Sequence, residues 1–206
     1  MDVYPLLRGA LIGLAIAAPV GPIGLLCIQR TLERGRAHGL ASGLGAATAD
    51  TVYGVIAALG LTAVSRVLVG QAAWLRVLGG IAMVALGWRT LRRRPGGAPA
   101  HAPSRGLAGA WASTLALTLT NPMTIVSFTA IMAGLGLGAR DGLGASAAWV
   151  AGVFLGSSLW WLALSTAVAL LRSRLPEAAL RWIRVTSNVV IVALGLLALA
   201  AALAPA

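Results

Sequence analysis

Six long apolar runs, separated by short arginine-containing stretches, organise this chain. They are Leu6–Ile28, Gly39–Val64, Ala72–Leu91, Leu107–Gly136, Gly142–Leu171 and Leu180–Leu203. Each run reaches the roughly 20 residues that a helix needs to cross about 30 Å of hydrocarbon. The pattern therefore predicts an all-α membrane protein with six transmembrane helices.

The arginines fall unevenly between the two sets of connections. The connections after the first, third and fifth runs, together with the adjoining run ends, contain Arg30, Arg34, Arg36, Arg89, Arg92, Arg93, Arg94, Arg105, Arg172, Arg174, Arg181 and Arg184. The opposite set contains Arg8, Arg66, Arg76 and Arg140. Because arginine accumulates in cytoplasmic loops, we expect both termini on the outer side of the membrane and the arginine-rich loops in the cytoplasm.

Residues 92–106 are rich in Arg, Pro and Gly and divide the chain into two halves of three apolar runs. We interpret residues 1–91 as a first three-helix repeat, 92–106 as a cytoplasmic linker and 107–206 as a second three-helix repeat. With an odd number of crossings in each half, the second half enters the membrane from the opposite side. The expected architecture is therefore a pair of inverted repeats.

Helix-breaking residues interrupt the first apolar run of each half. The first run carries Pro19, Gly21, Pro22 and Gly24, and the fourth carries Asn121, Pro122 and Thr124. Pro22 lies 16 residues after Leu6, and Pro122 lies 15 residues after Leu107. Irregular backbone at membrane depth is tolerated where protein or a wet cavity satisfies it, so matched breaks predict a transporter solute site. The alternative is that the prolines only kink helices for packing.

Asp50 is the one acidic residue inside any apolar run. It lies 11 residues after Gly39, which is about 16 Å along a helix and close to the bilayer centre. An ionised side chain there costs on the order of 3 kcal/mol. The small residues Ala46 and Gly54 share its helix face, and Tyr53 offers a hydrogen bond nearby. We expect Asp50 to carry a coupling proton or to recognise a substrate ammonium; the alternative is a protonated Asp that holds helices together.

The fifth and sixth runs contain weaker candidates. Small residues recur every four positions at Gly144, Ala148, Gly152 and Gly156, a spacing that predicts a packing seam. Ser157 follows this ridge, and its hydroxyl serves either a ligand or a carbonyl of its own helix. Asn188 either bridges helices or reaches the cavity.

Composition narrows the class of protein further. Hydrophobic residues make up 59% of the chain and charged residues 10%, with a mean hydropathy of +0.89. The net charge of +11 comes from arginines at the ends of apolar runs, with no lysine, which argues against nucleic-acid binding. The histidines, His38 and His101, are expected alone in polar loops, and the single Cys27 is expected to be inert. We therefore predict no cofactor, no metal site and no catalytic residue.

The motifs resemble those of the LysE/RhtB family of bacterial amino-acid exporters. They are Pro19-Val20-Gly21-Pro22-Ile23-Gly24, the basic loop with Arg30 and Arg34-Gly35-Arg36, Gly39 with Gly43, Ala49-Asp50-Thr51-Val52-Tyr53, Asn121-Pro122-Met123-Thr124-Ile125, and Gly152-Val153-Phe154-Leu155-Gly156-Ser157. The resemblance implies a six-helix inner-membrane secondary transporter that exports amino acids or similar solutes, driven by the proton gradient. The inserted Val20 and the Ala49 that precedes the acid depart from the family pattern and leave the substrate open.

Two other functions are weighed against amino-acid export. A metal cation exporter on the same fold would need several carboxylates, thiolates or imidazoles, whereas the apolar runs offer Asp50 and Cys27. A non-transport membrane scaffold would not need matched helix breaks. The sequence leaves open the solute, the coupling ion and whether the protein forms a homodimer.

Overall fold

The computed structural model describes residues 3–19, 21–58, 72–91, 106–121, 124, 128, 143–172, 174 and 176–203. Within these ranges the chain is all-helical. The helices are α1 (Tyr4–Ala17), α2 (Pro22–Arg34), α3 (Arg36–Ala58), α5 (Ala72–Leu91), α6 (Leu107–Leu119), α8 (Leu143–Arg172) and α9 (Glu177–Leu203). The linker at 92–105, Val20, Pro122 and the end of the second predicted run lie outside the described residues.

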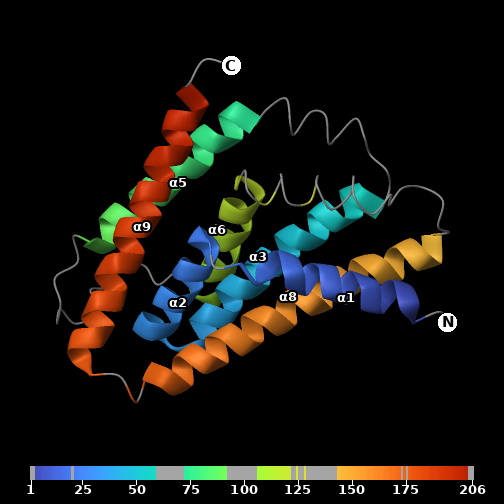
Figure 1. Cartoon of the computed structure of the whole chain (residues 1–206), viewed down its shortest axis with the longest axis horizontal. Coiled ribbons are helices and arrows are strands. Elements are labelled where there is room, and N and C mark those ends of the chain that lie inside the picture. Colours follow the sequence, from blue (N-terminus) through green and yellow to red (C-terminus); the bar gives the residue numbers. More distant parts are fainter. Residues whose placement is uncertain are drawn as a thin grey trace.

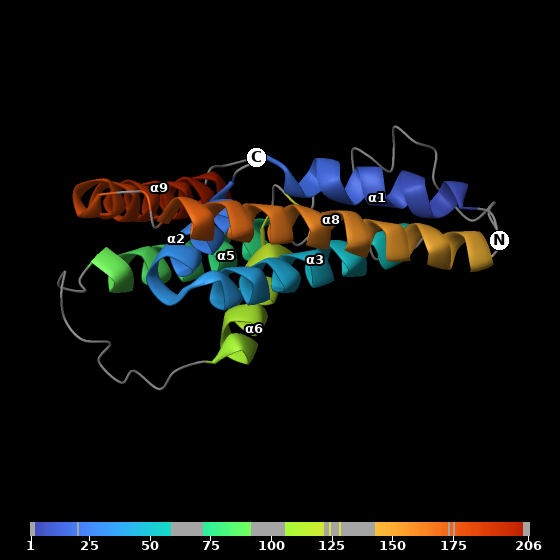
Figure 2. The same cartoon turned by 90° about the horizontal axis from the view of Figure 1, so that it is seen from below.

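The helices form two groups that α2 and α6 connect. On one side α5 and α9 lie side by side, and on the other α1, α8 and α3 are stacked, as Figures 1 and 2 show. The half-length helix α2 contacts α3, α8 and α9, while α6 crosses α3. One buried cluster surrounds α2 and draws residues from α1, α3, α5, α6, α8 and α9. A second lies between α3 and α8.

Glycines bring α1 and α8 into backbone contact. A Cβ added at Gly9 or Gly13 would collide with the carbonyl of Trp149 or Val153, and one added at Gly152 or Gly156 would collide with α1. Residue numbers rise together along the two helices, so they run in the same direction. The predicted seam is confirmed at Gly152 and Gly156, but it is wrong at Gly144, where an added Cβ meets nothing within 4 Å because α1 does not extend that far along α8.

The remaining pairs alternate in direction. Gly80 of α5 and Gly195 of α9 each face the other's backbone carbonyl, and the two helices run antiparallel. The contacts of Gly43 with Trp161 and of Gly54 with Val153 make α3 antiparallel to α8. By contrast, α3 and α6 run in the same direction. Gly45 lies against Trp111 and, further along both helices, Tyr53 contacts Leu119.

A sharp bend separates α1 from α2, and this confirms the first predicted interruption. The helix axes differ by 80° across the break. Pro22 occupies the first turn of α2, where its missing N–H removes no helical hydrogen bond, and its ring excludes a helix that continues from α1. In the second half, α6 ends at Leu119, two residues before Asn121. The continuation at Pro122 lies outside the described residues.

The predicted basic loop between the first two runs is wrong. Arg30 and Arg34 belong to α2, Arg36 begins α3, and His38 is helical rather than in a polar loop. Gly35 alone joins the two helices, with φ of 88°. Glycine adopts this left-handed backbone at little cost, so a single residue reverses the chain.

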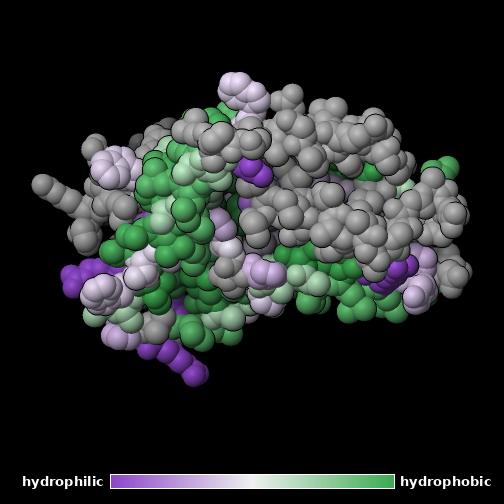
Figure 3. All heavy atoms as spheres, turned by 45° about the horizontal axis from the view of Figure 1, so that its top comes forward, coloured by the Kyte–Doolittle hydropathy of each residue, from purple (hydrophilic) through white to green (hydrophobic). Residues whose placement is uncertain are grey.

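The outer surface is suited to lipid. Large apolar side chains are exposed along α1, α8 and α9, among them Leu11, Leu159 and Leu197. Hydrophobic residues cover most of the described surface in Figure 3, and strongly hydrophilic ones form a few small patches. By length and composition, two described helices are long enough to cross a membrane, Leu143–Arg172 and Ala178–Ala202, or three if the bent α1–α2 pair counts as one span.

Candidate functional site

Asp50 lies in the interior, on the α3 face that packs against α8. Its side chain is 3% exposed, and Ala46, Ala47 and Ala49 beside it are almost completely buried. The small alanines let neighbouring helices approach this turn closely. The carboxylate is therefore enclosed by protein rather than directed at lipid.

A relay of hydrogen bonds ends on this carboxylate. The Ser157 hydroxyl donates to Asp50 Oδ2 over 2.7 Å, and Trp161 Nε1 donates to Ser157 Oγ over 3.2 Å. An indole N–H only donates, so the serine oxygen accepts from Trp161 and keeps its own hydrogen for Asp50. The relay joins α3 to α8, and the Ser157 hydroxyl donates to another helix, a partner that neither of the two interpretations from the sequence named.

Tyr53 links the Asp50 helix to the end of α6. Its hydroxyl donates to the Leu119 carbonyl over 2.7 Å, and its ring lies 5.4 Å from that of Phe128, centroid to centroid. The last carbonyls of a helix have no partner within it. Tyr53 therefore caps the end of α6, and it lies one turn along α3 from Asp50.

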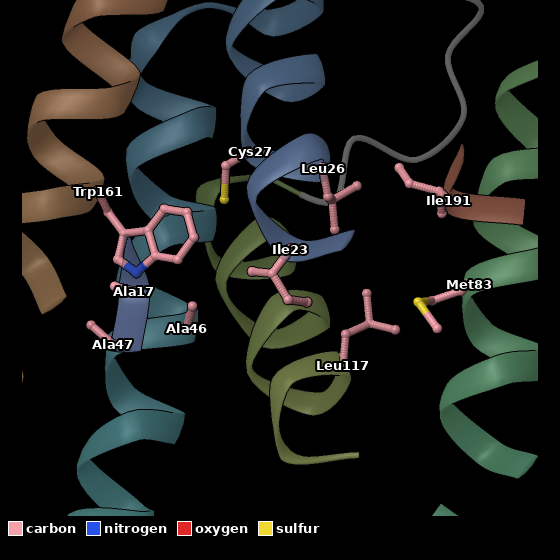
Figure 4. Close-up of a cluster of buried hydrophobic side chains, with 10 residues drawn as sticks. All are labelled: Ala17, Ile23, Leu26, Cys27, Ala46, Ala47, Met83, Leu117, Trp161 and Ile191. Carbon is pink, nitrogen blue, oxygen red and sulfur yellow. The ribbon is translucent and has the colours of Figure 1, made fainter. Parts of the chain in front are cut away.

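The bend between α1 and α2 approaches the same region by packing. Ala17, the last residue of α1, belongs to a buried cluster with Ala46, Ala47 and Trp161 (Figure 4). These residues lie within one turn of Asp50 or Ser157. The structure gives no side-chain hydrogen bond from the described residues of the bend to Asp50, so packing alone brings the two together.

The start of α2 presents main-chain donors inside the protein. The helix has no side-chain cap, and Ile23 and Gly24 in its first turn are buried. The first N–H groups of a helix lack partners within it, and the helix dipole makes this end attractive to negative charge. Among the described residues, the Leu25 N–H bonds to the Gly21 carbonyl at 3.1 Å. The amides of Ile23 and Gly24 lie in the same first turn, beside the bend.

The candidates named from the sequence fall into three groups. Asp50 and Ser157 are bonded directly, and Tyr53 lies one turn away. Pro19, Gly21, Pro22 and Gly24 form the bend and the start of α2. Asn121 follows α6, and its carbonyl accepts from the Thr124 N–H at 3.1 Å. Pro122 lies outside the described residues.

Sequence reasoning missed the role of Arg30, which it assigned to topology. The guanidinium is partly buried and donates from Nη1 to Ser42 Oγ and Thr114 Oγ1, both at 2.8 Å, and to the Ala110 carbonyl at 3.0 Å. From Nη2 it donates to Ser113 Oγ at 2.9 Å. The adjacent hydroxyls at 113 and 114 were the available signal, because two polar residues inside an apolar run need partners.

A bent helix pair packed near a buried carboxylate, glycine-mediated helix contacts and an apolar outer surface are typical of a helical membrane protein. Within this class, the chain belongs to the LysE type translocator family, whose profile matches residues 14–202. This confirms the resemblance found in the motifs, and because the family is one of transporters the protein is not an enzyme.

A relative from Bacillus subtilis (strain 168), named "Putative amino acid efflux protein YcgF", is 25% identical over 175 residues. The match covers 82% of this chain and 83% of the relative. No solved structure matches the chain significantly.

Proposed function

We propose that the protein is a secondary transporter that exports amino acids or closely related small solutes across the bacterial inner membrane, coupled to protons. The observation that carries this proposal is the enclosed Asp50 carboxylate. It lies within one turn of Ala46 and Ala47, which pack with Ala17 of the α1–α2 bend, and one turn along α3 from Tyr53, which bonds to the end of α6. Membership of a translocator family and the efflux function named for the Bacillus relative support it.

The two kinds of polar group match the two ends of an amino acid. The uncapped start of α2, with the amides of Ile23 and Gly24, suits the carboxylate of a zwitterion. Asp50 suits its ammonium group, or the proton that replaces it. Pro19, Gly21, Pro22 and Gly24 would shape the first of these subsites, and Asn121, Pro122 and Thr124 would shape the corresponding break in the second half.

We further propose six crossings arranged as two inverted repeats, residues 1–91 and 107–206, joined by a cytoplasmic linker at 92–106, with both termini in the periplasm. A two-fold axis in the membrane plane would exchange the first helix with the fourth, the second with the fifth and the third with the sixth. The observed pairs fit this exchange. It would convert the parallel α1–α8 pair into the parallel α6–α3 pair and map the antiparallel α3–α8 and α5–α9 pairs onto themselves.

The test is counterflow of labelled amino acids in proteoliposomes, with and without an imposed proton gradient. Wild-type protein should exchange at least one amino acid, and Asp50→Asn should abolish this flux while the protein stays folded in detergent. Thr51→Val is the matched control, because the Thr51 hydroxyl donates to the Ala47 carbonyl of its own helix. Wild-type flux from Asp50→Asn would remove Asp50 from the mechanism, and metal flux without amino-acid flux would replace the proposed solute.

A further inference from the structure

The half-helix α2 lies between two glycines. Gly21 precedes Pro22, and Gly35 separates Arg34 from the first residue of α3. An added Cβ at either glycine would meet nothing within 4 Å. Thus α2 is a 13-residue rod with an unobstructed joint at each end.

Nothing in the observed conformation requires a glycine at position 21. Its φ of −99° and ψ of −163° are accessible to any residue, unlike the φ of 88° at Gly35. Gly21 is the N-cap of α2, a position that favours glycine, and without a side chain it leaves this joint free to adopt other backbone angles. Movement about Gly21 and Gly35 would swing the rod relative to α3.

Arg30 is the residue that fastens this rod in place. It lies near the Gly35 end of α2, and its four hydrogen bonds reach Ser42 on α3 and three positions on α6. The acceptors on α6 are the Ala110 carbonyl and the hydroxyls of Ser113 and Thr114. One side chain therefore ties α2 to two other helices.

The hydroxyl hydrogens of this network already have acceptors. Ser42 donates to the His38 carbonyl at 2.9 Å, Ser113 to the Gly109 carbonyl at 2.7 Å and Thr114 to the Ala110 carbonyl at 3.0 Å. Their oxygens are thus left to accept from the Arg30 guanidinium. All these acceptors are neutral, so water can replace each of them without separating an ion pair. The contact is suited to opening and closing.

We propose that α2 is a mobile gate and that Arg30 is the clasp that holds it closed against α3 and α6. The clasp at Ser42 lies eight residues before Asp50 on α3, about 12 Å along the helix axis. Release of Arg30 lets α2 swing about Gly21 and Gly35 and opens a path from the Arg34 end of the molecule toward Asp50. The proposal rests on the proposed function in that a solute takes this path.

The chain contains its own reporter for this movement. Cys27 is the single cysteine, lies one turn before Arg30 on α2 and is 2% exposed. Figure 4 shows it among the buried side chains around α2, with Ile23 and Leu26. A closed gate shields this thiol, and a gate that swings away exposes it.

The experiment measures the rate at which N-ethylmaleimide modifies Cys27 in purified protein in liposomes. Arg30→Gln should raise this rate at least tenfold over wild type. Ser113→Ala and Arg30→Lys should give smaller increases, since the first removes the Nη2 acceptor and a lysine ammonium cannot span both helices. Arg34→Gln is the matched control, because Arg34 is exposed on the same helix.

A second control separates gate opening from general loss of stability. Gly156→Ala strains the α1–α8 contact and leaves the Arg30 contacts intact, so it should not accelerate Cys27 modification at temperatures where it stays folded. Equal rates in Arg30→Gln and Arg34→Gln would overturn the proposal. If Arg30→Gln does not fold, unchanged rates in Ser113→Ala and Thr114→Val would overturn it, and raised rates would support it. The assay needs no solute, so it tests the gate even if the protein transports no amino acid.

Discussion

The hydrogen bond from Ser157 to Asp50 allows the sharpest test of the site, because the neighbouring serine is a built-in control. Ser157→Ala removes the 2.7 Å donor to Asp50 Oδ2 and also the acceptor of the Trp161 N–H. Ser158→Ala removes a buried hydroxyl that has no hydrogen-bond partner among the residues that the structure describes. The two substitutions delete the same atom one residue apart, and only the first touches Asp50.

The free energy of the hydrogen bond distinguishes a neutral contact between helices from a bond that stabilises an ionised Asp50. Neutral hydrogen bonds between membrane helices contribute about 0.6 kcal/mol on average, with a maximum of about 1.7 kcal/mol. A hydrogen bond to an ionised group contributes about 1.5–3 kcal/mol. The 2.7 Å separation fits both classes, but the Trp161 donor behind Ser157 polarises the serine hydroxyl toward Asp50 and strengthens the bond to a charged acceptor. We therefore expect a coupling free energy between Ser157 and Asp50 of about 1.5 kcal/mol or more.

The assay is a double-mutant cycle of unfolding free energies in detergent, with wild type, Ser157→Ala, Asp50→Ala and the double variant. Ser158→Ala should change the free energy of unfolding by less than about 0.5 kcal/mol or stabilise the protein, because it leaves no partner unpaired. A coupling of about 0.6 kcal/mol or less would refute the reasoning. The bond would then be an ordinary interhelical contact, and Ser157 would not hold the charge of Asp50.

Two glycine substitutions test the packing and the hinge. Gly156→Ala places a Cβ against the backbone carbonyl of Ala10, so it should lower the free energy of unfolding by about 1–3 kcal/mol. Gly144→Ala is the control and should be neutral, because the space around Gly144 is open. Equal melting temperatures for the two variants would contradict the α1–α8 seam. Gly21→Ala should leave stability unchanged or raise it by about 0.4–1 kcal/mol, because its backbone angles suit alanine, yet slow transport in proteoliposomes. Normal flux from a stabilised Gly21→Ala would show that the hinge needs no glycine.

The interruption of the first span and the position of Asp50 could be predicted because each depends on local chemistry. Pro22 interrupts a helix because proline has no backbone N–H to donate and its ring clashes with the preceding turn. A lone acid in an apolar run must lie in an enclosed, polar environment. Tyr53 was predictable as a nearby hydrogen-bonding group from its spacing on α3, but its acceptor at Leu119 depends on where α6 crosses α3. Partners on another helix follow from packing, which the pattern of one run does not specify.

Arg30 shows why the role of an arginine at the end of an apolar run is hard to predict from the sequence. An arginine that follows an apolar run is typical of a cytoplasmic loop, and the residues at 34–36 strengthen that interpretation. The structure replaces the loop by one glycine, so α2 continues for a full turn past Arg30 and carries its guanidinium between α3 and α6. The acceptors lie 12 to 84 residues away in the sequence. The one-residue turn at Gly35 makes Arg30 part of a helix instead of a loop, and it is also the second joint of α2. The Arg30 clasp and this hinge therefore both follow from one short connection.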